Sequence, residues 1–159
     1  MQHAFTYDKK KVIQGLRYHF VQRPEVKVLV VLVNVFAIVA AVLFYSKKIR
    51  PEPFLLGSFI WVMMMASFWY ILPNSIYKKA IDTFKDQFTI AFKDNGVTLE
   101  NEKGFIHWDW NQFSHYFESP HFFHLYFSSR SFFMVPKDGM GEEFRHELRA
   151  ALKKGINTK

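Results

Sequence analysis

The chain of 159 residues contains no cysteine, which excludes a disulfide framework, a thiol nucleophile and a Cys-based zinc site. It also lacks a phosphate-binding Gly-x-x-x-x-Gly-Lys loop, a His-Glu-x-x-His pair and a serine nucleophile elbow. No pair of carboxylates or acid–base pair stands out. We therefore predict that the protein is not an enzyme and has no catalytic residues and no cofactor. A membrane-associated hydrolase is kept as a remote alternative.

In the second half of the sequence, the histidines are the only group that suggests a metal site. The five histidines concerned are His107, His115, His121, His124 and His146. His121 and His124 are three positions apart, so in a strand they face opposite sides of the sheet. The others lie on separate predicted elements. We accordingly expect packed or surface histidines and no metal site.

Charge is absent from two long apolar runs, Val28 to Ser46 and Phe54 to Leu72, each of 19 residues. At about 1.5 Å of rise per residue, each helix would be roughly 28 Å long, close to the hydrocarbon thickness of a bilayer. Only seven residues connect the runs. The sequence therefore predicts a transmembrane helical hairpin with both chain ends on one side of the membrane.

Basic residues flank this hairpin unevenly. Nine lie outside it, in the preceding segment and just after the second run, against three in the connecting link. Cytoplasmic flanks carry the excess of Lys and Arg in membrane proteins, so we expect both termini in the cytoplasm.

The net charge of +7 is concentrated near the predicted membrane, because residues 74–159 hold only one net positive charge. That distribution fits anionic lipid headgroups better than nucleic acid, and no nucleic-acid partner is expected. The predicted headgroup contacts are Lys9, Lys10, Lys11, Arg17, Lys78 and Lys79.

A helix is predicted from Lys9 to about Gln22, with Asp8 as its N-cap. Val12, Leu16 and Phe20 recur on one face. This stripe has two interpretations, a helix packed on the rest of the protein or an interfacial helix resting on anionic lipid. A short strand at residues 3–7 precedes the helix.

From Gln87 the apolar period changes to two, which predicts a meander of short antiparallel strands. The expected strands lie near residues 88–93, 97–99, 105–110, 113–118, 121–128 and 132–135. A closing helix follows, with Asp138 as its cap, a stripe formed by Met140, Phe144, Leu148 and Leu152, and Gly155 beyond its end.

Three stretches of this meander carry a resemblance to a known family: Phe105-Ile106-His107-Trp108, the aromatic strand Phe122 to Phe127, and Phe132-Phe133-Met134-Val135-Pro136-Lys137. Together with the preceding hairpin, they resemble the YcxB-like family of bacterial membrane proteins. The resemblance implies a two-helix hairpin followed by a domain like a pleckstrin-homology (PH) barrel. It implies no catalytic residue. About 70 residues are few for a complete seven-stranded barrel and a helix, so either the barrel is partial or residues 2–7 return and supply a strand. We favour the second option, because both chain ends are expected on one side of the membrane.

The expected fold class is a membrane α-helical hairpin plus an α+β cytoplasmic domain, an antiparallel PH-like barrel or sheet of five to seven strands capped by a C-terminal helix. The expected segments are 1–27 (strand and amphipathic helix), 28–72 (hairpin, with spans 28–46 and 54–72), 73–86 (juxtamembrane helix) and 87–159 (YcxB-like domain).

We expect an inner-membrane protein whose PH-like module binds a peptide, a protein or a lipid headgroup. Its partners would be the lipid bilayer and either another protein or a second copy of the chain. The alternative is an accessory subunit that stabilises a larger membrane complex.

Overall fold

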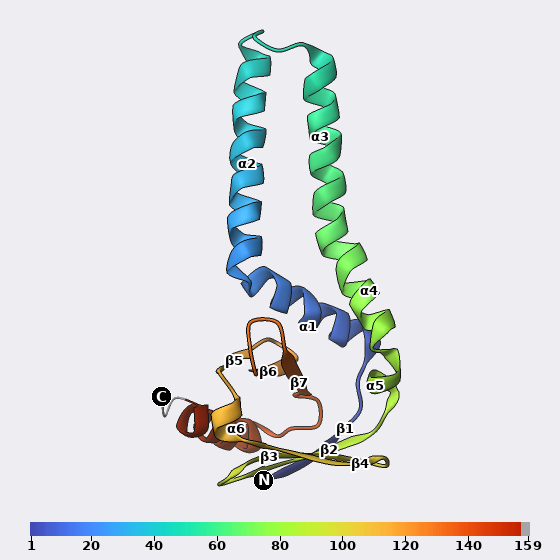
Figure 1. Ribbon diagram of the computed structural model, residues 1–159, viewed down its shortest axis with the longest axis vertical. Coiled ribbons are helices and arrows are strands. Elements are labelled where there is room, and N and C mark those ends of the chain that lie inside the picture. Colours follow the sequence, from blue (N-terminus) through green and yellow to red (C-terminus); the bar gives the residue numbers. More distant parts are fainter. Residues whose placement is uncertain (157–159) are drawn as a thin grey trace. The chain divides into compact units, whose positions relative to one another are not determined.

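The computed structural model describes residues 1–156, and the chain divides into two compact units (Figure 1). One unit combines Met1–Gly15 with the chain from Ala80 onward. The other is Leu16–Lys79. The first unit thus joins two segments that are far apart in the sequence.

The second unit contains two helices that are long and apolar enough to cross a membrane, α2 (Pro24–Tyr45) and the helical segment Pro51–Lys79. The latter comprises α3 (Pro51–Ala66), a π-helical turn (Ser67–Ile71) and α4 (Leu72–Lys79). α2 and α3 run side by side, with the Phe44 and Phe54 rings stacked 4.4 Å apart near the connecting link (Figure 1). Neither helix has a buried residue. Apolar surface exposed all round a helix suggests association with a membrane.

α1 (Lys9–Gln22) begins as the sequence predicts, because Asp8 Oδ1 accepts a hydrogen bond of 3.0 Å from the backbone N–H of Lys11. Val12, Leu16 and Phe20 are all buried. The apolar stripe is therefore covered by protein, as the packed interpretation of this helix requires.

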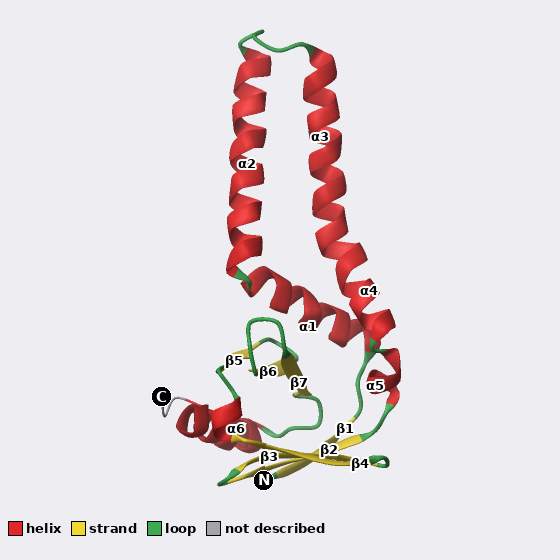
Figure 2. Ribbon diagram, in the orientation of Figure 1, coloured by secondary structure: helices red, strands yellow, loops and turns green. Residues whose placement is uncertain are grey.

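Seven strands form two antiparallel sheets in the part of the chain from residue 1 to 156 (Figure 2). The first sheet has the order β1 (Gln2–Phe5), β2 (Phe88–Lys93), β3 (Gly96–Asn101) and β4 (Gly104–Asp109). The second has the order β5 (His115–Glu118), β6 (Phe122–Tyr126) and β7 (Phe132–Pro136). The short helix α5 (Ile81–Lys85) precedes β2, a 3₁₀ turn (Trp110–Gln112) separates the sheets, and α6 (Glu142–Ile156) follows β7.

The expected barrel is wrong in one respect, because the two sheets are open and do not close into a barrel. The 3₁₀ turn at Trp110–Gln112 breaks the strand pairing between β4 and β5. The N-terminal segment does return to the sheet, since β1 pairs with β2 in the register Gln2–Ala91 to Phe5–Phe88.

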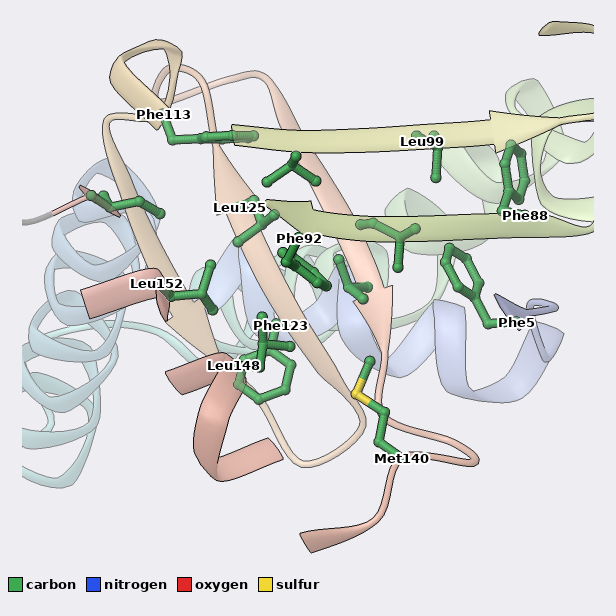
Figure 3. Close-up of a cluster of buried hydrophobic side chains, with 14 residues drawn as sticks. Phe5, Phe88, Phe92, Leu99, Phe113, Phe123, Leu125, Met140, Leu148 and Leu152 are labelled. Carbon is green, nitrogen blue, oxygen red and sulfur yellow. The ribbon is translucent and has the colours of Figure 1, made fainter. Parts of the chain in front are cut away.

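One hydrophobic core joins both sheets and α6 (Figure 3). Its buried side chains come from β1, β2 and β3 on one side and from β6 and β7 on the other, with Leu148 and Leu152 of α6 closing it. The opposite face of β6 is covered as well. A Cβ at Gly15 of α1 would lie 2.9 Å from Phe122 Cδ2, so only glycine lets the helix approach this closely.

The ends of α6 differ from the prediction. Asp138 does not cap the helix, which begins at Glu142; its carboxylate pairs with Lys11 Nζ at 2.8 Å. Gly155 does not end the helix either. A Cβ there would meet Trp110 Cδ2 at 2.5 Å, so this glycine serves close packing of α6 on the indole.

Candidate functional site

The free edges of the two sheets are the places where another chain could pair, and three of the four are protected. On the β7 edge, the hydroxyl of Tyr7 donates a hydrogen bond of 2.7 Å to the carbonyl of Met134. On the β5 edge, Arg149 of α6 binds Glu118. The β1 edge is only four residues long, and the rings of His3 and Phe144 lie 5.8 Å apart beside it. Covered or short edges resist pairing with other chains.

The β4 edge is open. Within residues 1–156, β4 pairs with β3 alone, and its first four residues are all exposed. The side chain of Phe105 is 75% exposed and that of Ile106 is 54% exposed. The strand contains neither proline nor lysine, the residues that commonly block an edge.

The register shows which backbone groups of β4 point outward. A two-residue turn joins the paired residues Asn101 and Gly104. Such a turn closes on a hydrogen-bonded pair, and bonding then alternates along the strand. Gly104, Ile106 and Trp108 therefore bond to β3. The N–H and C=O groups of Phe105 and His107 face away from the sheet.

The hydrogen bonds between β1 and β2 lead to the same alternation. Met1 and Phe92 exchange two hydrogen bonds, of 3.0 and 2.8 Å, so even-numbered residues of β2 bond to β1. Odd-numbered residues of β2 then bond to β3, as the Lys93–Gly96 turn also requires.

An apolar pocket of about 270 Å³ adjoins the open edge. Phe88, Leu99 and Ile106 line it, together with the polar residues Asn101 and Lys103. Phe88 and Leu99 are buried beneath it, whereas Ile106 is half exposed at its rim. The edge thus offers backbone hydrogen-bonding groups next to a small apolar recess.

A second cluster joins β5, β7 and α6 through Glu118. Arg149 binds both carboxylate oxygens at 2.9 Å, and Lys137 Nζ lies 2.5 Å from one of them. Lys137 is only 8% exposed and its ammonium lies 4.9 Å from the ring centroid of Phe123. Hydrogen bonds from Arg149 and then Lys137 lower the pKa of Glu118 from 4.5 to about 2. This saturated ion cluster holds the sheet to α6 and leaves little capacity for a ligand.

The predicted headgroup residues lie in different settings. Lys11 is paired with Asp138, and Arg17 is engaged with the second apolar helix. Lys9, Lys10, Lys78 and Lys79 are exposed.

Arg17 fills a gap that Pro73 creates. Proline has no N–H for the carbonyl four residues earlier, that of Trp69. Arg17 Nε donates a hydrogen bond of 3.0 Å to this carbonyl, and its guanidinium lies 5.1 and 5.5 Å from the ring centroids of Trp69 and Tyr70. This contact was not predicted from the sequence. The indication present in the sequence was Pro73, which follows Trp69 by four residues and leaves the carbonyl of Trp69 without its helical donor.

The histidines do not converge on a metal. Among residues 1–156, no three His, Cys, Asp or Glu side chains are grouped closely enough to hold an ion. His115 stacks on Tyr126 at 4.3 Å, and His124 is buried with Nε2 3.0 Å from Ser119 Oγ. His107 lies 2.9 Å from Thr98 Oγ1 on the outer face of the first sheet.

Comparison with known proteins supports the resemblance seen in the sequence. The family model described as YcxB-like protein matches residues 92–152, from the end of β2 into α6. No curated protein and no solved structure matches the chain. The open β4 edge, its pocket and the Glu118 cluster all include residues of the matched segment. Residues 92–152 therefore resemble the YcxB-like family.

Proposed function

We propose that this protein is a membrane-anchored binding module whose β4 edge accepts an extended segment of a protein as an additional strand. The open β4 edge carries the proposal. It is long enough to pair, unprotected and apolar, whereas the other edges are covered or short. Strand addition uses main-chain hydrogen bonds for affinity and adjacent pockets for selectivity.

The edge would contribute both kinds of interaction. The outward N–H and C=O groups of Phe105 and His107 supply main-chain bonds. An apolar side chain of the added strand would enter the recess beside Ile106. Full burial of side chains such as Phe105 and Ile106 contributes about 1.5–3 kcal/mol each.

The arrangement of the module supports a PH-like domain. Among residues 1–156 its two sheets have four and three strands and a C-terminal helix follows them, an arrangement compatible with the PH-like fold that the family resemblance implies. We place the domain on the cytoplasmic side of a bacterial inner membrane, since the basic residues concentrate outside the hairpin link. The proposed role is binding, because β4 presents outward backbone amides next to the exposed apolar side chains of Phe105 and Ile106.

An accessory subunit of a larger membrane complex is the second candidate. A groove of about 660 Å³ between α2 and α3 favours it, with small residues such as Ala37, Ala40 and Gly57 in its lining. Small residues let helices approach closely within a bilayer. In that role the hairpin, and not β4, would make the contact.

Selection of random peptides displayed on phage against the full-length protein in nanodiscs tests the main proposal. His107→Pro removes an outward N–H without removing a bond to β3, so it should abolish peptide binding. Ala4→Pro makes the matched change at an outward position of β1 and should leave binding intact. Selected peptides that bind both variants equally well, or a library that yields no binder, would refute strand addition at β4.

A further inference from the structure

We propose that the strand which β4 accepts is β4 of a second copy, paired antiparallel about a two-fold axis. This inference rests on the proposed function and names the partner of the same edge. We choose a second copy as the partner because the outward backbone groups and the charged side chains of one β4 edge can pair with those of another.

Backbone geometry restricts how two copies can pair. Only Phe105, His107 and Asp109 direct their N–H and C=O groups away from β3. Antiparallel pairing must therefore set these odd-numbered residues opposite one another. Two registers keep five of the six residues of β4 paired, one centred on Ile106 and the other on His107.

The side chains favour the register centred on Ile106. It places Lys103 of the β3–β4 turn opposite Asp109 of the second copy, and it sets the two half-exposed Ile106 side chains face to face. Opposite charges across a strand pair stabilise it. The register centred on His107 instead puts the two His107 rings together and Asp109 against Phe105.

The existing contacts of the two charged residues are compatible with this pairing. Lys103 Nζ lies 2.7 Å from Asp86 Oδ2 and its side chain is 70% exposed. Asp109 Oδ1 lies 3.3 Å from His107 Nε2, and its side chain is 59% exposed. Each residue retains free surface, so Lys103 would lie between two carboxylates in the dimer.

Self-pairing would also protect the edge. An isologous pair joins the two four-stranded sheets into one sheet of eight strands, with the same surface used on both copies. Ile106 and the outward amides of both chains would no longer face solvent.

The absence of native cysteine allows a direct test in lipid nanodiscs or membranes. Four full-length variants each carry one cysteine: Phe105→Cys, Ile106→Cys, His107→Cys and Trp108→Cys. In the proposed register the two cysteines introduced at position 106 form a non-hydrogen-bonded pair with Cα atoms about 4.5 Å apart, within the range of a disulfide. Mild oxidation should cross-link Ile106→Cys roughly tenfold faster than Trp108→Cys, which lies opposite Gly104. Gln2→Cys, on the β1 edge, is the control for random collision.

The pattern of cross-linking decides the outcome. Fastest cross-linking at position 106 supports the proposal, whereas fastest cross-linking at position 107 or 105 overturns the register. Equal rates at all positions, or no cross-link at 106, overturn the dimer.

A charge exchange gives an independent measurement. Asp109→Lys should slow cross-linking of the Ile106→Cys variant, and adding Lys103→Asp should restore it; failure of the restoration also contradicts the register.

The proposed function can survive failure of the dimer. If Ile106→Cys stays monomeric while displayed peptides bind in a manner that His107→Pro abolishes, strand addition at β4 stands and only the identity of its partner is wrong.

Discussion

At the scale of single residues, the carboxylate of Glu118 is held in a cluster of opposite charges. It is held by Arg149 and by the nearly buried Lys137, so its pKa lies near 2 in the folded protein. A carboxylate whose pKa is depressed by folding stabilises the protein above its unfolded pKa, here 4.5. That contribution is lost progressively as the pH falls from about 5 toward 2.

Replacement of Glu118 by Gln should therefore lower stability at pH 7 by about 2 kcal/mol, because Lys137 loses its countercharge in a nearly buried position. The difference between variant and wild type should shrink toward pH 3. Thermal unfolding of the full-length protein in detergent at several pH values measures it. Glu147→Gln, on the exposed face of α6, is the matched control. A difference that does not change with pH would contradict this account of the cluster.

At the scale of elements, the second apolar helix shows what sequence patterns can and cannot give. The apolar run predicts a span, and Pro73 predicts a disturbance near its end. The pattern does not say how the freed carbonyl of Trp69 is satisfied. The answer comes from Arg17, 52 residues away, whose guanidinium binds this carbonyl beside the π-helical turn.

Arg17→Lys should destabilise this turn, because lysine keeps the charge but loses the planar donor group and the stacking face. A hydrogen bond from a charged donor contributes about 1.5–3 kcal/mol, so amide exchange in residues 69–74 should accelerate about tenfold or more. Hydrogen–deuterium exchange of the protein in nanodiscs measures this. Arg130→Lys, in the exposed β6–β7 turn, should have no such effect. Unchanged exchange in the Arg17 variant would show that the contact does not support the turn.

The strands illustrate the same limit. Alternation of apolar residues predicts the meander, and the Asp94–Asn95 turn predicts the β2–β3 hairpin, both as observed. The alternation of apolar and polar residues indicates which face of a strand is buried, but not whether another strand pairs along each of its edges. An edge strand and a central strand therefore show the same pattern. The open β4 edge therefore emerges only from the pairing of all seven strands. The break between the sheets likewise depends on the 3₁₀ turn after Asp109, which has no strong local signal.

At the scale of the whole molecule, the two candidate functions assign the contact surface to different units of the chain. A binding module uses β4 and needs the hairpin only as an anchor. An accessory subunit uses the surfaces of α2 and α3. Replacement of the hairpin by an unrelated one therefore distinguishes the two functions.

Replacement of residues 28–66 by an unrelated two-helix hairpin of equal length retains Trp69, Tyr70 and Pro73, and with them the contact made by Arg17. In the binding module, peptides selected on β4 should keep their affinity within about twofold, or about 0.4 kcal/mol, because no residue of β4 is changed. Fluorescence anisotropy of a labelled peptide with the protein in nanodiscs measures this, with His107→Pro as the non-binding control. If the exchange abolishes binding while the thermal transition of the folded domain is unchanged, recognition depends on the apolar helices, and the accessory-subunit function replaces the one proposed here.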